Sequence, residues 1–247
     1  SDSIMSDNEV HKAVPMGLGM GDQGSGSLAY PVLDPRPPIP DPRPLLQMEG
    51  ITKSFPGVVA LQGVSLDVRG GEVHVLLGEN GAGKSTLVKI LTGAYQMDAG
   101  SILWKGNPAQ IGSPADAQRL GISVIYQEFN LVPQLSIGEN IFITREPVQA
   151  ALGPVRFIDW PRLYRQAKEL LRSLELDLDP RQPVEGLGVA QQQMVEIAKA
   201  LSVNAEVIVM DEPTSALTDR EIDELFKVIR TLRSQGKSII YITHRLD

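Results

Sequence analysis

One short stretch of the sequence has residue types and spacing that suit phosphate binding. Residues 78–85 read Gly-Glu-Asn-Gly-Ala-Gly-Lys-Ser and fit the pattern G-x-x-x-x-G-K-[S/T]. Glycines let successive backbone N–H groups turn toward phosphate oxygens, and Lys84 is expected to reach the β- and γ-phosphates of a nucleotide. Ser85 offers a hydroxyl to Mg²⁺, and the helix expected after the loop directs its positive end at the anion. The stretch predicts a phosphate-binding loop; a glycine-rich turn without a ligand is the alternative.

Two carboxylates at the end of an apolar run form a second candidate group. Residues 207–210 read Val-Ile-Val-Met, as in a buried strand, and Asp211 and Glu212 follow at once. In a nucleotide site the first carboxylate would hold Mg²⁺ through water, and the second would orient and deprotonate the attacking water. Acidic residues at a strand end are common on surfaces, so this interpretation depends on the phosphate loop.

Polar residues also follow two other expected strands. Gln127 comes directly after residues 122–126, and His244 comes directly after residues 238–243. In open parallel sheets, ligands bind outside the carboxyl ends of the strands. We therefore expect Gln127 and His244 near the phosphate loop and Asp211, although His244 taken alone would be better explained as an ordinary capping or core histidine.

A fourth candidate is the turn Leu187-Gly188-Val189-Ala190-Gln191, which precedes an expected helix. A turn of small residues at a helix start can hold an anion. A plain junction between a loop and a helix is the alternative.

The elements expected to position these groups alternate between strands and helices, which predicts an α/β fold with a mainly parallel sheet. A capping box of Thr218 and Glu221 predicts one helix start, and Asp159 is a possible cap for another. The expected strands are 73–77, 122–126, 207–210 and 238–243. The expected helices are 87–93, about 161–174, one that follows the stretch 187–193 and ends near 201, and 219–235.

Composition excludes several classes. The 247 residues are 42% hydrophobic, with 23 basic and 30 acidic side chains and no cysteine. The acidic balance argues against nucleic acid as the main ligand, and the missing cysteines exclude disulfides and thiolate metal sites. No apolar run approaches the ~18 residues of a membrane span, and no secretory signal is evident. Residues 1–47 are rich in Gly and Pro; they predict a disordered tail and linker, with an SH3-type ligand as the alternative.

These motifs, in this order, resemble an ATP-binding-cassette (ABC) nucleotide-binding domain over about residues 46–247. The resemblance implies a P-loop NTPase core with a mainly parallel sheet, an antiparallel β edge subdomain and a helical subdomain (about residues 114–189) within a domain of residues 48–247. It also implies roles for individual residues. The nucleotide-binding set is Phe55, Gly78, Glu79, Asn80, Gly81, Ala82, Gly83, Lys84, Ser85 and Thr86; the metal set is Ser85, Gln127 and Asp211; the catalytic set is Glu212, His244 and Gln127; and residues 187–191 form a signature segment that acts on the opposite domain of a dimer. Phe55 is placed to stack on adenine, with a packed core phenylalanine as the alternative.

Longer stretches, such as GENGAGKSTLVKILTGAY and YQEFNLVPQLSIGENIF, resemble the bacterial monosaccharide importers of the ribose, xylose and galactose type. The resemblance implies a peripheral ATPase on the cytoplasmic face of the inner membrane that uses Mg²⁺ with ATP. Its implied partners are a second nucleotide-binding domain, membrane permease subunits contacted through residues 129–142, and, indirectly, an extracytoplasmic sugar-binding protein. Because such proteins usually carry two domains in one polypeptide, a chain that stops at Asp247 is expected to be a C-terminally truncated first half. A soluble ABC ATPase acting on DNA or ribosomes, or an ATP-binding module with weak or no turnover, is the alternative.

One departure from the family bears on activity. The family signature begins Leu-Ser, whereas this chain has Leu187-Gly188, and Ala190 replaces a glycine. In the family that serine binds the γ-phosphate held by the opposite domain. A hydrogen bond to a charged group is worth ~1.5–3 kcal/mol, so the site completed by this segment is expected to be slow.

Overall fold

The structure, a computed structural model, describes residues 44–79, 81–152 and 155–244. All of them fall within the unit Pro37–Asp247. The predicted tail before residue 44 and the loop residue Asn80 lie outside the described residues. No helix in the described ranges is long and apolar enough to cross a membrane.

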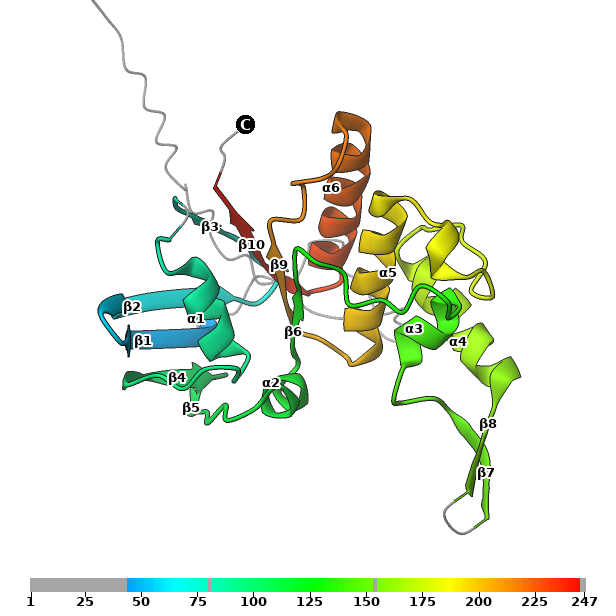
Figure 1. Cartoon of the computed structure of the whole chain (residues 1–247), viewed down its shortest axis with the longest axis horizontal. Coiled ribbons are helices and arrows are strands. Elements are labelled where there is room, and N and C mark those ends of the chain that lie inside the picture. Colours follow the sequence, from blue (N-terminus) through cyan, green and yellow to red (C-terminus); the bar gives the residue numbers. More distant parts are fainter. Residues whose placement is uncertain (1–43, 80, 153–154, 245–247) are drawn as a thin grey trace, which may run out of the picture. The chain divides into compact units, whose positions relative to one another are not determined.

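A four-stranded parallel sheet lies at the centre of the described part (Figure 1). Its order is β3 (Val73–Leu77), β10 (Ser238–Thr243), β9 (Val207–Asp211) and β6 (Ile122–Ile125). In β9, Ile208 and Met210 pack into one hydrophobic cluster, whereas Val207 and Val209 pack into another on the opposite face. Both faces of the strand are therefore covered, which explains why its sequence is apolar throughout instead of alternating.

Helices cover one face of this sheet. They are α5 (Val189–Ser202) and α6 (Asp219–Ser234), which lie beside β9 in Figure 1. Helices α3 (Ile137–Phe142) and α4 (Trp160–Ser173) pack on α5, farther from the sheet. The start of α6 has the predicted capping box, because the Thr218 N–H donates to the Glu221 carboxylate at 2.9 Å. The start of α4 has the predicted Asp159 cap, which accepts the Arg162 N–H at 3.0 Å.

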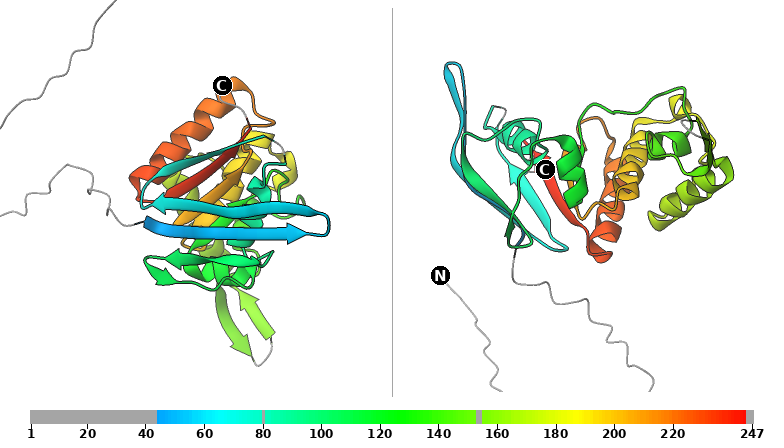
Figure 2. Two further views of the ribbon diagram at one scale, coloured as in Figure 1. Left: turned by 90° about the vertical axis from the view of Figure 1, so that its left-hand side faces the viewer. Right: turned by 90° about the horizontal axis from the view of Figure 1, so that it is seen from below.

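The other face packs against α1 and an antiparallel sheet. Helix α1 (Lys84–Leu91) shares a buried cluster with β1 (Pro44–Phe55) and β2 (Val58–Arg69). The sheet continues through β4 (Ala99–Trp104) and β5 (Asn107–Pro108), and Figure 2 (left) shows β1 and β2, in blue and cyan, running side by side. Helix α2 (Pro114–Leu120) joins this cluster through Ala117. Helix α1 and its preceding loop thus lie between two sheets.

The predicted α/β architecture with parallel and antiparallel parts is confirmed, and every expected strand is present. Three features were not anticipated. They are the hairpin of β7 (Val148–Leu152) and β8 (Val155–Ile158), the two short helices α2 and α3, and a 3₁₀ turn at Val184–Gly186. The first strand begins at Pro44, inside the stretch expected to be tail.

Candidate functional site

The predicted phosphate loop connects β3 to α1, and Lys84 folds back over it. The Lys84 ammonium donates hydrogen bonds to the carbonyl oxygens of Gly78, at 2.5 Å, and Glu79, at 2.9 Å. The Ala82 N–H donates to the Glu79 carbonyl at 3.1 Å, which closes a turn within the loop. The cation is therefore held at the start of α1, where the free N–H groups of the helix also favour negative charge.

Glycines are required in this loop for two different reasons. Gly81 and Gly83 both have left-handed backbone conformations, with φ of +85° and +88°. At Gly81 an added Cβ would meet nothing within 4 Å, so glycine is favoured there only because of the left-handed backbone conformation. At Gly83 an added Cβ would lie 2.6 Å from the Ala60 carbonyl oxygen, so the loop also packs directly on β2.

The loop opens onto a hollow of about 200 Å³ that also contains the acidic end of β9. Its lining residues are Val58, Val59, Ala60, Gly81, Gly83, Lys84, Ser85, Thr86, Asp211 and Glu212. The structure thus brings the Lys84 ammonium, the Ser85 hydroxyl and the Asp211 carboxylate to one cavity. A hollow of this size matches a phosphate chain better than a whole nucleotide.

Asp211 sits in an unfavourable place for a lone carboxylate. Burial, together with the adjacent Glu212, raises the pKa of Asp211 above its ordinary value, and Lys84 and Lys89 only partly oppose this. A divalent cation here would relieve the strain on the charged form. Among the described residues, no group of three or more His, Cys, Asp or Glu side chains is arranged to hold a metal ion by itself. One carboxylate and one hydroxyl therefore fit Mg²⁺, which is usually held by one or two carboxylates together with substrate phosphates.

Glu212 is joined to the predicted His244 at the same sheet edge. The His244 Nδ1 lies 2.9 Å from the Glu212 Oε1. Glu212 has a positive φ of 47°, and its N–H donates to the Ile242 carbonyl on β10 at 3.0 Å. A non-glycine residue held in this conformation costs of order 1–3 kcal/mol and is typical of functional sites. The two side chains form an acid–base pair next to the phosphate loop.

Two other predicted residues lie nearby but do not line the hollow. Gln127 is exposed two residues beyond β6, and Ile125 of that strand pairs with Met210 of β9. This register puts Gln127 at the same sheet edge as Glu212. Phe55 lies at the end of β1, is 36% exposed, and contacts the edge of the Tyr95 ring at 5.4 Å between centroids. Phe55 is therefore accessible to a ligand, and its stacking on adenine stays a prediction.

The signature segment lies at the start of α5, away from the hollow. Gly188 caps the helix, and its N–H donates to the Gln191 side chain at 3.2 Å. The neighbouring Val189 is 39% exposed. None of the residues 187–191 lines the hollow of the phosphate loop in this chain, and their action on a nucleotide of another domain stays a prediction.

Val58 and Val59 are lining residues that the sequence did not indicate. Both are 62% exposed on β2, at the end of the hairpin that carries Phe55. Nothing in their residue types marks them, because the contact arises when β2 packs against the loop. Their exposed apolar surface beside the phosphate loop suits a flat apolar ligand group.

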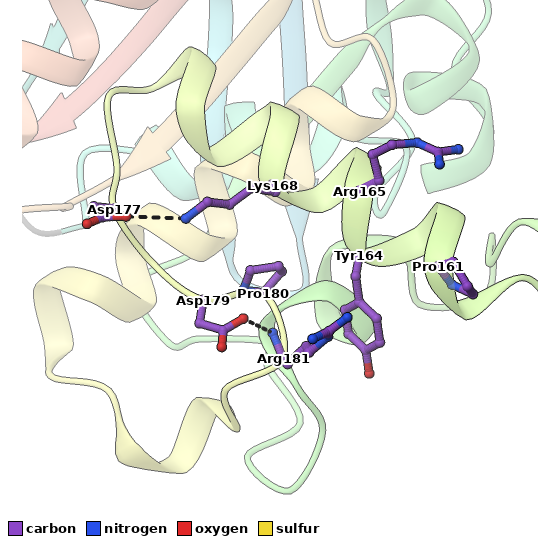
Figure 3. Close-up of a pocket in the computed structure, with 8 residues that line it drawn as sticks. All are labelled: Pro161, Tyr164, Arg165, Lys168, Asp177, Asp179, Pro180 and Arg181. Atoms are coloured by element: carbon purple, nitrogen blue, oxygen red, sulfur yellow. Dashed lines mark hydrogen bonds and ion pairs between the residues drawn. The ribbon is translucent and has the colours of Figure 1, made fainter.

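A larger hollow, of about 620 Å³, lies on α4 and the segment 177–181. In Figure 3, Lys168 reaches toward Asp177 and the Arg181 guanidinium lies against the Tyr164 ring. The ammonium of Lys168 also donates to the Leu178 carbonyl at 3.0 Å. These contacts fasten the segment 177–181 to α4, and the hollow shares no residue with that of the phosphate loop.

The phosphate loop, the acidic end of β9 and the parallel sheet together define a nucleotide-binding domain of the P-loop class. Residues 61–215 match the ABC transporter family. The chain belongs to this family, as its sequence motifs predicted.

Similar proteins agree with this assignment. The chain is 56% identical over 205 residues to the ribose import ATP-binding protein RbsA 1 of Rubrobacter xylanophilus, covering 83% of this chain and 40% of that relative. It is 54% identical to a putative ribose/galactose/methyl galactoside import ATP-binding protein of Burkholderia ambifaria, covering 86% and 40%. A crystal structure of an ATP-binding cassette of an ABC transporter in its ADP conformation matches with a TM-score of 0.72 and 30% identity, covering 83% of this chain and 82% of that chain. The chain thus spans well under half the length of the sugar-import relatives.

Proposed function

We propose that this chain binds Mg²⁺-ATP and hydrolyses it as the motor domain of a bacterial importer of monosaccharides. The observation that carries the proposal is the hollow lined by Lys84, Ser85 and the two carboxylates at the end of β9. The sugar-import names of relatives at 54–56% identity supply the transport role.

The residues of this chain divide the chemistry between them. Lys84 and the amides at the start of α1 would neutralise the phosphates, and Ser85 and Asp211 would hold Mg²⁺. Gln127, two residues beyond β6, would complete the metal set. When bound, Mg²⁺ would neutralise charge that develops on the phosphates. Glu212 would position and deprotonate the attacking water, and His244, 2.9 Å from its carboxylate, would hold Glu212 in place and contact the γ-phosphate.

A second copy or a second domain is needed to complete the site. The hollow is open and small, and the signature segment of the same chain lies outside it. A related cassette, 25% identical with a TM-score of 0.65, has been solved as a dimer bound to ADP and Pi. We infer that ATP is held between the phosphate loop of one domain and residues 187–191 of another.

The partners and location follow from the transport role. The domain would act at the cytoplasmic face of the inner membrane as a peripheral subunit. Residues 129–142 would contact a membrane permease, which receives the sugar from an extracytoplasmic binding protein. Nucleic acid has no place in this scheme, given 30 acidic against 23 basic side chains.

One observation favours a second candidate, an ATP-binding module with little or no turnover. Gly188 cannot donate a side-chain hydrogen bond to a γ-phosphate across a dimer. Binding would then persist while hydrolysis is weak.

The experiment that tests nucleotide binding compares two lysine variants. Lys84→Ala removes the ammonium of the phosphate loop, whereas Lys227→Ala removes an exposed lysine on α6. Loss of a hydrogen bond to a charged group predicts about a tenfold to hundredfold weaker affinity for Mg²⁺-ATP in Lys84→Ala, measured with a fluorescent analogue, and no change in Lys227→Ala. Equal affinities in the two variants would refute the site.

A further inference from the structure

The backbone N–H and C=O of Asn130, in the segment that follows Gln127, are both hydrogen-bonded to side chains of α5. The Asn130 N–H donates to the Glu196 carboxylate at 2.9 Å, and the Lys199 ammonium donates to the Asn130 carbonyl oxygen, also at 2.9 Å. The Lys199 ammonium lies 4.0 Å from the same Glu196 oxygen. A carboxylate and an ammonium one helical turn apart on α5 thus hydrogen-bond to the N–H and the C=O of the same residue, Asn130.

Glu196 is an unusual group to find in this position. It is only 7% exposed, in an otherwise apolar stretch of α5, and burial raises its pKa. Burying a carboxylate costs free energy unless its oxygens are hydrogen-bonded and paired. An apolar side chain would fill the same space at lower cost, so packing alone does not account for a hydrogen-bond acceptor there.

The same segment is fixed a second time, by Asn140 of α3. This side chain is fully buried, accepts the Val132 N–H at 2.7 Å and donates to the Val132 carbonyl at 3.0 Å. It also donates to the Leu135 carbonyl at 3.3 Å. Residues 130–135 are therefore anchored at both ends by buried polar side chains.

The anchored segment is in turn bonded to the stretch that leads into the signature segment. The Val184 N–H donates to the Leu135 carbonyl at 3.1 Å, and the Glu185 N–H donates to the Pro133 carbonyl at 2.9 Å. Two residues later the chain reaches Leu187. The segment 130–135 is thus hydrogen-bonded both to α5 itself and to residues 184 and 185, which precede the signature segment.

We propose that Glu196 and Lys199 are positioning residues that clamp Asn130, so that the loop after Gln127 and the signature segment move as one rigid body. Gln127 would serve the nucleotide of its own domain, whereas residues 187–191 would serve that of the opposite domain. The clamp would therefore couple movement at the nucleotide site of one domain to movement at the nucleotide site of the opposite domain. This consequence rests on the proposed function, but the rigid coupling does not.

The test compares two conservative substitutions by hydrogen exchange on the nucleotide-free chain. Glu196→Gln keeps the reach and an acceptor oxygen but not the charge, whereas Glu196→Asp keeps the charge and is one methylene shorter. Glu169→Gln, on the exposed face of α4, is the matched control. Lys199→Met removes the second half of the clamp and serves if Glu196→Asp fails to fold by circular dichroism.

The expected result is coupled loosening. Loss of the hydrogen bond from the Asn130 N–H should speed exchange in residues 128–136 by about tenfold or more in Glu196→Asp, and exchange in residues 187–192 should rise with it. Glu196→Gln and Glu169→Gln should resemble the unsubstituted chain. Faster exchange confined to residues 128–136, or none at all, would overturn the proposal.

Adding Mg²⁺-ATP separates this inference from the proposed function. Failure of the proposed function would show as no protection of residues 78–86 in the unsubstituted chain. Failure of the clamp would show in Glu196→Asp without nucleotide, whether or not ATP binds.

Discussion

The two left-handed glycines of the phosphate loop allow one sharp prediction. Gly81 and Gly83 have nearly equal φ angles, +85° and +88°, but different surroundings. An added Cβ at Gly81 meets nothing within 4 Å, whereas one at Gly83 would lie 2.6 Å from the Ala60 carbonyl oxygen and 2.7 Å from the Leu61 Cδ2. The Ala60 oxygen is backbone and cannot turn aside. The losses in unfolding free energy caused by Gly81→Ala and Gly83→Ala should therefore differ only by the cost of this clash.

The expected magnitudes follow from that comparison. The left-handed conformation costs alanine about 1–2 kcal/mol at either position. Forcing a methyl group into a packed contact adds about 1–3 kcal/mol, at Gly83 alone. Since 1 kcal/mol shifts the melting temperature of a domain of this size by about 2–4 °C, Gly83→Ala should melt about 2–12 °C below Gly81→Ala.

The assay is thermal unfolding of both variants, followed by circular dichroism, together with binding of a fluorescent ATP analogue. Gly83→Ala should also bind more weakly, because relief of the clash moves the loop off β2 and shifts Lys84. Equal melting temperatures for the two variants would refute the packing of the loop on Ala60.

Three further predictions concern other parts of the site. Gly188→Ser should raise ATP turnover per chain about tenfold or more, because the serine hydroxyl supplies the missing hydrogen bond to the γ-phosphate. Serine fits there, since Gly188 has φ of −67° and an added Cβ would meet nothing within 4 Å. An unchanged rate of phosphate release would mean that the missing hydroxyl does not limit turnover. Asp211→Asn should raise the melting temperature at pH 7. The reason is that the pKa of Asp211 is raised in the folded chain, so that ionisation of this carboxyl destabilises the fold as the pH increases. The gain should vanish below about pH 4, where the carboxyl is protonated in both states, and a gain independent of pH would contradict the burial argument. Gln193→Met should raise the free energy of unfolding, measured in urea, by about 1–3 kcal/mol. The Gln193 Nε2 is buried with no hydrogen-bond partner among the described residues, and methionine removes this polar group. A lower free energy of unfolding would instead indicate that the amide has a partner.

Much of the site was predictable because its signals are local. The loop residues 78–85 form a contiguous pattern, and Asp211 follows directly on a strand whose apolar run reflects burial on both faces. The capping box of Thr218 and Glu221 likewise lies within one turn of chain. In each case the signal itself lies within one short stretch of sequence.

The features that sequence reasoning missed depend on contacts between distant segments. Val58 and Val59 line the hollow only because β2 packs on the loop. Glu196 stands out as a charge in an apolar helix face, but its partner Asn130 is 66 residues away, and no spacing rule connects them. The hairpin of β7 and β8 lacks a strong alternating pattern in its sequence, Val-Gln-Ala-Ala-Leu and Val-Arg-Phe-Ile.

The most direct test of the central claim is phosphate release from Mg²⁺-ATP at rising protein concentration, with Glu212→Gln measured alongside. Because the signature segment lies outside the hollow of its own chain, the site should be completed only by a second copy. The rate per chain should climb with concentration and disappear in Glu212→Gln, while both proteins bind ATP. Binding without release at any concentration, or a rate that survives in Glu212→Gln, would contradict it.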